Sequence, residues 1–454
     1  MKKIIFSVLL LSFSMNATLA VTVTDKQKHY ETILVENIET DEPGVAVIVS
    51  QKGKVLFKGA RGLANLEHNI PLTTESVFRL ASITKQFTAA AIMMLQEQKK
   101  LSIADNIHKY IPEFPTEGND ITIENLLTHT SGIANYTEDQ DIFANEIQVP
   151  TTIDEMLLRF AKHPMKFKTG EKMRYSNTGY VLLGKIIEVA SGQSYADFIE
   201  ENIFKKIDMK SSRYGGSQII PNRANGYDTT PGGVVNAMYI NMMWPHAAGS
   251  LLSTTTDMNI WFSALRDGEL VSKESYQMMV EPFKLNDGSI SNYGYGYGLG
   301  ISKLSRYDTI AHNGGMPGFS ADAFYIPSED LYIAVFSNLS SRDASFISQL
   351  LAVEALDITL PKFEPVQVNE NKVKSFMGSY QIGADSVRTL SMENGKFYSQ
   401  RDEGRRLEII PMSENSFYFE DSLIYIIIEK NKEGKQVMNF YSGLAIEPQQ
   451  AIKI

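Results

Sequence analysis

A short proline-bounded segment, Pro361-Lys362-Phe363-Glu364-Pro365, divides this chain of 454 residues into two parts with different patterns. Before it, strand-like runs alternate with longer segments in which apolar residues recur at helical spacing. After it, only short strand-like runs separated by turn residues remain. Because paired prolines favour an extended linker, the sequence predicts a linker at 361–365 between a first domain, 21–360, and a second domain, 366–454. The chain is long enough to bury a large core.

The first domain is predicted to place strands and a helix at its two ends around a mainly helical middle. Residues 44–49 and 55–62 indicate an antiparallel hairpin, and residues 321–326 and 331–337 indicate two further strands. We expect helices over 21–42, 82–98, 178–204, 254–267, 274–280 and 342–357. This order is typical of an α+β domain with one antiparallel sheet.

The second domain is predicted to be all-β. Its strand-like runs lie at 375–380, 389–392, 396–399, 416–419 and 423–428. Glu393-Asn394-Gly395-Lys396 is typical of a tight hairpin turn. We therefore expect a small antiparallel barrel or sandwich.

Two glycine-containing segments invite a functional interpretation. Residues 293–301 alternate tyrosine and glycine, which predicts a strand closely approached by another backbone, so sheet packing is favoured over a ligand site. Residues 179–185 match most of a phosphate-binding loop. Ile186 replaces the required hydroxyl residue and the segment lies in an apolar helix, so we reject a phosphate site there.

The N-terminus has the pattern of a secretory signal peptide over residues 1–20. Lys2 and Lys3 precede an apolar run, and small residues follow up to Ala20. A membrane anchor would need about 20 continuous apolar residues, whereas polar residues interrupt this run. We therefore expect an exported protein, periplasmic or secreted, with no stable membrane insertion.

Composition narrows the possible chemistry. The formal net charge is −10 without basic clusters, which argues against nucleic acid as a partner. The chain has no cysteine, so disulfides, thiol catalysis and thiolate metal sites are excluded. Its seven histidines show no metal-binding spacing, and we expect neither metal nor cofactor. The oligomeric state stays open.

Ser82-Ile83-Thr84-Lys85 could contain a self-activated nucleophile. On a helix, a three-residue step places both side chains on one face. The Lys85 amine could then accept the Ser82 hydroxyl proton, provided that burial keeps the amine neutral. A lone pair of this spacing is weak evidence, because it arises by chance in a chain of this length.

Two later segments could complete an acyl-transfer site. Tyr175-Ser176-Asn177 offers a phenol that could lose its proton near cations and shuttle it, and an amide that could hold a substrate carbonyl. His312-Asn313-Gly314-Gly315 could supply an oxyanion hole, because glycines before a strand allow substrate to approach exposed backbone N–H groups.

These three motifs, in this order, resemble those of the penicillin-recognising serine hydrolases. The similar branch contains class C β-lactamases, D-alanyl-D-alanine carboxypeptidases, D-aminopeptidases and related esterases. Further segments at 78–88, 121–132, 247–254 and 314–319 look like the same family. The resemblance covers about 30–360 and implies a β-lactamase/transpeptidase-like domain, an antiparallel sheet with a helical domain, followed here by the all-β domain.

The resemblance also implies roles for individual residues. Ser82 matches the acylated nucleophile, Lys85 its base and Tyr175 a second proton-transfer group. Asn177 matches a substrate-orienting amide, and the backbone N–H groups of Ser82 and Gly315 match the oxyanion hole. Gly314 and His312 match the substrate-binding strand.

His312 is a departure from the Lys-Thr-Gly motif usual in true β-lactamases. An imidazole binds a substrate carboxylate less strongly than a permanently charged lysine. The pattern therefore looks more like the D-aminopeptidases and esterases than like efficient β-lactamases. His129, in a Thr-His-Thr-Ser-Gly context, is interpreted as a structural loop residue.

The expected activity is hydrolysis through an acyl-enzyme on Ser82, with small D-amino-acid-containing peptides or amides, possibly peptidoglycan-derived, as substrates. Simple esters and β-lactams are the alternatives within the family. A non-catalytic member that keeps the fold as a binding or scaffold protein, or a module dominated by a glycan-binding second domain, is the alternative of another class. Ser82→Ala and Lys85→Ala are each expected to abolish turnover with little change in melting temperature.

Overall fold

The computed structural model describes residues 25–291, 294–383, 386–420, 422–445 and 447–454. The segment 1–20 expected to be a signal peptide, and Tyr293 of the Tyr/Gly run, lie outside these residues. The chain forms two compact units. One includes residues up to Ser302 with Asp308–Glu354, and the other consists of Lys303–Tyr307 with Ala355–Ile454. No helix among the described residues is long and apolar enough to cross a bilayer.

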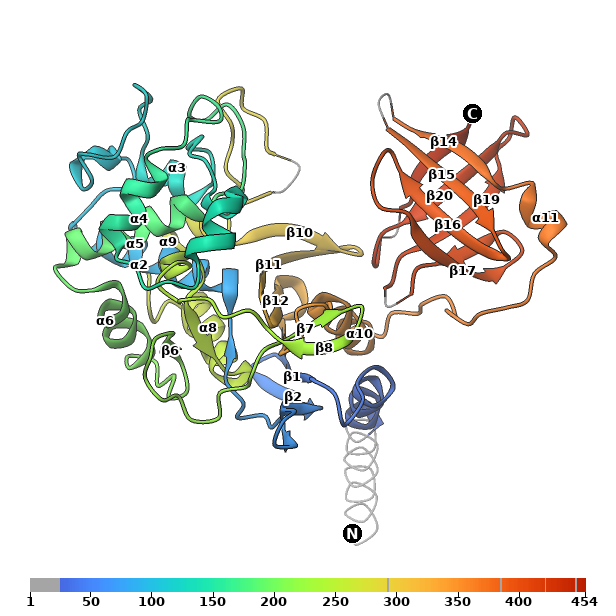
Figure 1. Cartoon of the computed structure of the whole chain (residues 1–454), viewed down its shortest axis with the longest axis horizontal. Coiled ribbons are helices and arrows are strands. Elements are labelled where there is room, and N and C mark those ends of the chain that lie inside the picture. Colours follow the sequence, from blue (N-terminus) through green and yellow to red (C-terminus); the bar gives the residue numbers. More distant parts are fainter. Residues whose placement is uncertain (1–24, 292–293, 384–385, 421, 446) are drawn as a thin grey trace, which may run out of the picture. The chain divides into compact units, whose positions relative to one another are not determined.

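A six-stranded antiparallel sheet organises the first unit, in the order β10-β11-β12-β13-β1-β2 (Figure 1). Its strands are β1 (Val45–Gln51), β2 (Lys54–Arg61), β10 (Gly300–Leu304), β11 (Tyr307–Met316), β12 (Phe319–Ile326) and β13 (Leu331–Ser337). β1 pairs with β13, with Val45 opposite Ser337, so the two ends of the unit meet in one sheet. The predicted hairpin, the two later strands and the α+β class are confirmed.

Helices cover both faces of this sheet, which explains why every residue of β13 is buried. On β12, Asp322 contacts Ser348 of α10 (Ala344–Ala355), whereas Tyr325 packs on Phe262 of α8 (Thr255–Asp267). Residues 322 and 325 point to opposite sides of a strand, so α10 and α8 cover opposite faces. A helix over 25–37 adds Tyr30, whose ring stacks on Phe57 of β2 at 5.3 Å.

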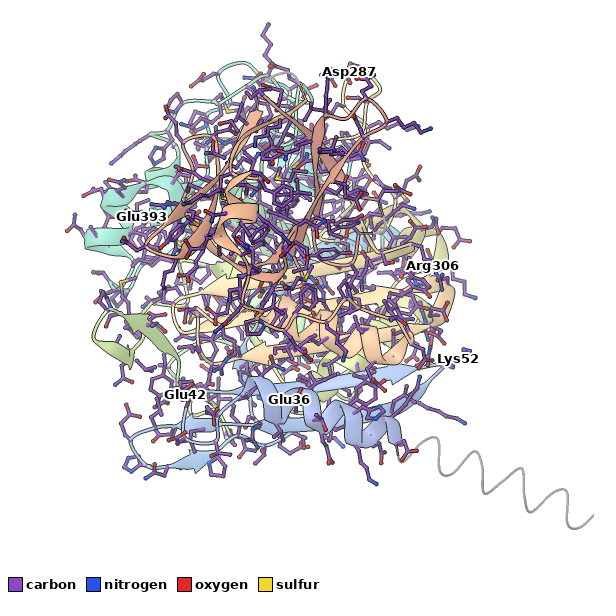
Figure 2. The ribbon with its side chains drawn as sticks, turned by 90° about the vertical axis from the view of Figure 1, so that its right-hand side faces the viewer. Glu36, Glu42, Lys52, Asp287, Arg306 and Glu393 are labelled. Atoms are coloured by element: carbon purple, nitrogen blue, oxygen red, sulfur yellow. The ribbon has the colours of Figure 1, made fainter. Side chains whose placement is uncertain are left out.

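Most charged side chains of this unit are exposed, unlike Lys85 and Asp322, which are buried. Glu36 on the N-terminal helix and Lys52 in the β1–β2 turn lie at the surface (Figure 2). Lys52 has a φ of 52°, the left-handed conformation that a tight hairpin turn requires. This turn joins the two strands of the hairpin that the sequence predicted.

The helical part of the unit is built around α2 (Thr84–Glu97), of which twelve consecutive residues, Thr84–Leu95, are buried. Phe87 of α2 stacks on Trp261 of α8 at 3.8 Å. A second long helix is α5 (Asn177–Ser191). The shorter helices are α3 (Ile123–Leu127), α4 (Ile153–Phe160), α6 (Tyr195–Ile199), α7 (His246–Gly249) and α9 (Lys273–Met279). Small strands β3 (Leu63–Asn65), β4 (Ile70–Pro71), β5 (Phe78–Arg79), β6 (Arg213–Tyr214), β7 (Tyr227–Thr230), β8 (Gly233–Asn236) and β9 (Leu251–Ser253) connect them.

Two expectations about elements are wrong. The single helix expected over 178–204 is interrupted, because α5 ends at Ser191 and Gly192 adopts a left-handed φ of 75°. The Tyr/Gly run is not a strand over 294–299, and the strand begins only at Gly300. The expected close backbone approach is present: a Cβ at Gly298 would lie 2.5 Å from the carbonyl oxygen of Lys85.

The second unit contains a closed barrel of eight antiparallel strands, one of the two all-β forms expected (Figure 1). After α11 (Glu370–Lys374) come β14 (Gly378–Ile382), β15 (Ser386–Glu393), β16 (Lys396–Arg401), β17 (Leu407–Ser413), β18 (Ser416–Tyr418), β19 (Tyr425–Lys430), β20 (Gln436–Tyr441) and β21 (Gln449–Lys453). β14 pairs with β21 and closes the barrel. Its own core includes Tyr380, Phe417 and Met438, all fully buried.

Candidate active site

Ser82 lies on a short 3₁₀ turn, Ala81–Ile83, that leads directly into α2. Ala81 has a φ of 47°, a left-handed conformation that is uncommon for a residue with a Cβ. Neighbouring bonds fix the turn: the Leu80 amide donates to the carbonyl of Leu251 at 2.9 Å, and the Leu251 amide donates to Thr84 Oγ1 at 3.1 Å. The Ser82 side chain is thereby held at the surface end of a buried helix, where its hydroxyl stays half-exposed.

The Lys85 amine lies beneath Ser82 and is fully buried. Its Nζ is 3.0 Å from Ser82 Oγ, 2.8 Å from Asn177 Oδ1 and 2.8 Å from the carbonyl oxygen of Ala248. The structure therefore brings together three of the predicted residues. The contact to Ala248 was not predicted, because it joins positions 163 residues apart.

Burial lowers the pKa of Lys85 well below its ordinary value. A neutral amine has two N–H donors and one lone pair. The two donors match the oxygens of Asn177 and Ala248, which leaves the lone pair to accept the Ser82 hydroxyl proton. The geometry thus suits Lys85 as the general base for Ser82.

Asn177 is held at the start of α5 by contacts with a neighbouring loop. Ser176 caps the helix, accepting from the Gly179 amide. The backbone amide of Asn177 donates to Asn135 Oδ1 at 3.0 Å, and its Nδ2 donates to Thr137 Oγ1 at 3.3 Å. Because Nδ2 donates to Thr137, the other end of the amide, Oδ1, points to Lys85 and accepts its hydrogen bond.

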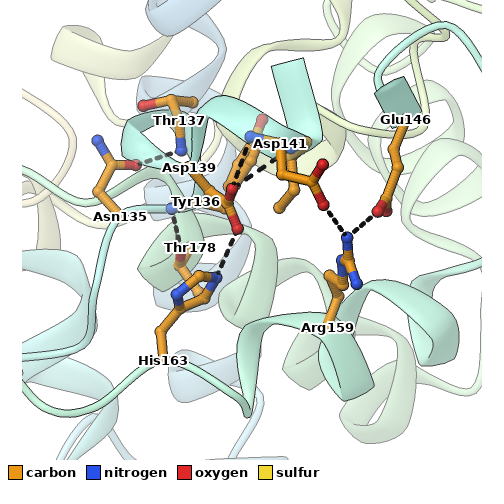
Figure 3. Close-up of polar contacts among 10 residues, drawn as sticks. Asn135, Tyr136, Thr137, Asp139, Asp141, Glu146, Arg159, His163 and Thr178 are labelled. Atoms are coloured by element: carbon orange, nitrogen blue, oxygen red, sulfur yellow. Dashed lines mark hydrogen bonds and ion pairs between the residues drawn. The ribbon is translucent and has the colours of Figure 1, made fainter. Parts of the chain in front are cut away.

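A polar network fixes the loop that carries Asn135 and Thr137 (Figure 3). The Tyr136 amide donates to Thr178 Oγ1 at 2.9 Å, which ties the loop to the first turn of α5. Arg159 of α4 bridges Asp141 and Glu146 farther along the same loop. Sequence reasoning missed this support, because its charged members are scattered over polar segments without a motif.

Tyr175 faces the nucleophile from the opposite side. Lys85 Nζ lies 4.8 Å from the centre of its ring. Burial raises the pKa of Tyr175, and a hydrogen bond to Ser82 opposes this shift only in part. The sequence analysis left open that nearby cations could take the proton of this phenol, whereas in the resting site burial favours the protonated hydroxyl. Tyr175 rests as a proton donor.

His129 supports the Tyr175 ring. The two rings are 4.3 Å apart, and the backbone amide of Ser176 donates to His129 Nδ1 at 3.1 Å. Burial, followed by the nearby Lys85, lowers the pKa of His129 well below its ordinary value, so the imidazole is neutral. This matches the interpretation of His129 as a structural residue and adds that it positions Tyr175.

His312 is brought near the other residues, but its imidazole lies beneath the substrate strand and is only 7% exposed. Its Nδ1 donates to the carbonyl of Asn313 at 2.6 Å, and its Nε2 accepts from the Tyr295 hydroxyl at 2.9 Å. Burial lowers its pKa to about 3. A neutral, doubly bonded imidazole supplies no charge for a substrate carboxylate.

Tyr295 is a member of this site that sequence reasoning assigned to sheet packing. Its ring is 4.8 Å from His129 and 6.5 Å from Tyr175, and its hydroxyl holds His312. The alternating tyrosines were the available signal. They were interpreted as a strand because alternation has the period of a strand.

Gly314 and Gly315 lie at the end of β11 beside Ser82. A Cβ at Gly314 would stand 2.2 Å from the carbonyl oxygen of Leu80 and 3.1 Å from the Ser82 nitrogen, so only glycine fits there. A Cβ at Gly315 would meet nothing within 4 Å. Gly315 borders a cavity of about 450 Å³ lined by Ser82, Tyr175, Asn313, Gly314, Gly315, Ser320, Ala321, Asp343 and Ser345.

Neither a lysine nor an arginine lines this cavity. Among the described residues, no group of three or more histidines and acids could hold a metal ion. The side chains at the cavity that bear on acyl transfer are Ser82 and Tyr175, with Lys85 beneath Ser82, and Asp343 is the acid among the lining residues.

Comparison with known proteins places this site in a family. Residues 25–356 match the family described as Beta-lactamase. The chain belongs to the beta-lactamase family. This family includes penicillin-binding proteins and serine hydrolases, and the fold and the branch expected from the motifs are confirmed.

Relatives within the beta-lactamase family match most of the chain. Penicillin-binding protein 4* of Bacillus subtilis is 30% identical over 420 residues, covering 87% of this chain and 92% of the relative. An octameric penicillin-binding protein homologue from Pyrococcus abyssi has a TM-score of 0.64 and 27% identity. The match covers 96% of this chain and 99% of the homologue. A D-stereospecific amidohydrolase from Streptomyces sp. has a TM-score of 0.63 and 25% identity. The match covers 73% of this chain and 99% of the amidohydrolase.

Proposed function

We propose that this protein is a serine hydrolase that cleaves amides of D-amino acids through an acyl-enzyme on Ser82. The observation that carries the proposal is the 3.0 Å contact between Ser82 Oγ and a fully buried Lys85 amine whose pKa is lowered. A buried lysine held only for structure would not need a half-exposed serine as its third partner. The D-stereospecific amidohydrolase among the similar structures supports the substrate class.

The acylation step follows from the contacts. Lys85 Nζ takes the proton from Ser82 Oγ, which attacks the substrate carbonyl carbon. The backbone N–H groups of Ser82 and Gly315 stabilise the resulting oxyanion. The new Lys85 ammonium still donates hydrogen bonds to Asn177 and Ala248. Its Nζ also faces the rings of Tyr175 and Tyr180, whose centres are 4.8 and 5.4 Å away.

Tyr175 then passes its hydroxyl proton to the leaving amine, and the Lys85 ammonium replaces that proton. The C–N bond breaks and the acyl group stays on Ser82 Oγ. A water molecule then attacks the acyl carbon. Its proton passes to Tyr175 while Tyr175 passes its own hydroxyl proton to Lys85. Lys85 returns its proton to Ser82 Oγ as the acid is released, which restores the starting state.

The cavity supports amides over β-lactams as substrates. β-Lactam substrates carry a carboxylate, whereas the cavity lining includes Asp343 and lacks both lysine and arginine. His312, which occupies the motif position of a lysine, is neutral and turned to Tyr295. Export remains part of the proposal, because an exported hydrolase of D-residues would meet peptidoglycan fragments.

The test is a substrate panel with purified protein: D-amino-acid amides, D-alanyl peptides, short acyl esters and a chromogenic cephalosporin. D-Amino-acid amides should give the highest kcat/KM, and Ser82→Ala should lower it at least about 10³-fold. Equal turnover by Ser82→Ala would disprove the mechanism. A higher kcat/KM for the ester or the cephalosporin would disprove the substrate class.

A further inference from the structure

Asp343 is an exposed acid at the rim of the cavity that contains Ser82. It lies one residue before α10. Its Oδ1 accepts from the Ser345 amide at 2.9 Å and from Ser345 Oγ at 2.6 Å, which closes a local turn. This turn engages Oδ1 and places the carboxylate at the start of α10, at the rim of the cavity.

Hydrogen bonds and strand register link Asp343 to the nucleophile. The amide of Ala344, the next residue, donates to Ser320 Oγ at 3.2 Å. Ser320 stands opposite Gly315 in the β11–β12 pair, about 5 Å away as cross-strand neighbours are. Gly315 borders the cavity and follows Gly314, which packs on the Ser82 nitrogen. A substrate lying along β11 therefore passes both Ser82 and Asp343.

Among the residues that line the cavity, none carries a positive charge that could balance Asp343. In the part of the chain that the structure describes, Asp343 forms no ion pair. The guanidinium of the adjacent Arg342 is directed to Glu42, at 3.5 Å, and to the carbonyl of Pro43. Asp322, the other acid in this region, contacts Ser348 and lies near enough to Asp343 to feel its charge. Lys85, which contacts Ser82 from below, has a pKa that burial lowers well below its ordinary value.

We propose that Asp343 is a specificity determinant, selecting substrates that carry an ammonium group and disfavouring those with a carboxylate in the same place. An ammonium would gain the Coulomb attraction of an otherwise unpaired carboxylate, and a carboxylate would meet repulsion. The inference rests on the proposed hydrolase function and names the residue that would recognise an ammonium group of its substrate. The ammonium could belong to the acyl group or to the leaving group.

The chain offers a matched control for the structural role of Asp343. Asp287 closes the same turn, with its Oδ1 accepting from the Ser289 amide at 2.9 Å and from Ser289 Oγ at 2.6 Å. It is exposed at the surface and does not line this cavity (Figure 2). Asp343→Asn and Asp287→Asn each remove one charge and keep the acceptor oxygen, and asparagine caps helices as well as aspartate does.

The experiment measures equilibrium binding in a Ser82→Ala background, so that it does not depend on turnover. Three anilides, D-alanyl, propionyl and succinyl, vary the acyl group from ammonium through neutral to carboxylate. Acetyl-D-alanine amides of ethylenediamine, propylamine and β-alanine vary the leaving group in the same way. Kd is measured by calorimetry at low and high salt. The same measurements are made with Asp343→Asn and with Asp287→Asn, each in the Ser82→Ala background.

In at least one series the ammonium ligand should bind about fivefold more tightly than the neutral one, as for a partly exposed ion pair. Asp343→Asn should remove this preference, Asp287→Asn should keep it, and high salt should reduce it. Equal Kd values in both series, tighter binding of the carboxylate, absence of binding, or a preference that survives in Asp343→Asn would overturn the inference. Failure of the proposed hydrolysis would appear separately, as equal turnover by the wild type and Ser82→Ala.

Discussion

At the scale of single residues, the state of Lys85 decides what Ser82 can do. Among the described residues, the amine contacts two acceptor oxygens, a hydroxyl and two aromatic rings, and no acid. An adjacent carboxylate would have held the proton on the amine. Its absence from these contacts lets burial keep the base available at neutral pH.

The pH dependence of acylation should reflect this. Acylation needs the neutral amine, so kcat/KM should rise with pH through the Lys85 pKa and then level off. Because burial lowers that pKa well below its usual value, the plateau should be reached well below pH 10. A pH–rate profile with a D-amino-acid amide measures it. A rise centred near pH 10.5 would mean that the amine is normally charged.

Replacement of Lys85 separates its chemical role from its packing role. Lys85→Arg keeps a cation that cannot lose its proton, so turnover should fall at least about 10³-fold. Lys85→Ala should also lower stability by about 2–4 kcal/mol, because it leaves a cavity and two unpaired buried oxygens. This corrects the expectation of a nearly unchanged melting temperature. Ser82→Ala, at a half-exposed position, should unfold as the wild type does in thermal denaturation.

Buried neutral histidines should make the fold sensitive to acid. The pKa of His312 is lowered to about 3 and that of His246 to about 4, both by burial. Between these values and about 6.5 the unfolded chain binds more protons than the folded one, so stability is lost as pH falls below about 6.5. Urea unfolding at pH 4–8 should show this fall, and His312→Gln should make it shallower. An identical slope in His312→Gln would contradict the neutral assignment.

Several site residues were predictable because they lie in short motifs with fixed local geometry. Ser82 and Lys85 share one helical face, and Asn177 begins a helix capped by Ser176. The contact between the Ala248 carbonyl and Lys85 was not predictable, because only tertiary packing brings the two together. The Tyr/Gly run singled out Tyr295, but its contact with His312 also depends on tertiary packing. The burial of His312 likewise depends on Tyr295, seventeen residues away.

At the scale of elements, the end of β11 sets the distance between nucleophile and substrate strand. Gly314→Ala would place a methyl group against the Leu80 carbonyl and the Ser82 amide. The strand should shift, and kcat should fall about 10²-fold because a displacement of about 1 Å can cost that much. Gly315→Ala, whose Cβ meets nothing within 4 Å, is the control for stability.

Steady-state kinetics and thermal denaturation of both variants check this. Gly314→Ala should lower kcat together with the melting temperature, whereas Gly315→Ala should keep the melting temperature. Wild-type kcat in Gly314→Ala would show that the contact between β11 and the Ser82 turn does not matter for catalysis.

The prediction of helices and strands succeeded where the spacing of apolar residues matched the burial seen in the structure. Residues 331–336 are hydrophobic, and with Ser337 they form a strand covered on both faces. It failed where one residue overrode the pattern: Gly192, in a left-handed conformation, ends α5 although apolar residues continue beyond it. In the Tyr/Gly run, alternation reflects close backbone contacts at Gly296 and Gly298 rather than strand pairing.

At the scale of the whole molecule, each unit has its own hydrophobic core. The barrel core around Tyr380, Phe417 and Met438 is separate from the core around α2 and the sheet. A closed barrel leaves no unpaired sheet edge, so it should fold without help from the first unit. The sequence predicted an all-β second domain because its turns are local, and strand pairing alone distinguished a barrel from a sandwich.

Scanning calorimetry should therefore resolve two unfolding transitions. Tyr380→Ala should lower only one of them, since this side chain lies in the barrel core, whereas Phe87→Ala should lower only the other. One transition that shifts as a whole in both variants would show that the two cores unfold together.

The central claim is that Ser82 is acylated with Lys85 as its neutral base. It is tested most directly by the rate at which a slowly hydrolysed acyl ester labels the protein, with the label located by peptide mass spectrometry. The label should reside on Ser82, at a rate that reaches its plateau well below pH 10 and falls at least about 10³-fold in Lys85→Arg. A label on another residue, or equal rates in the wild type and Lys85→Arg, would contradict the account.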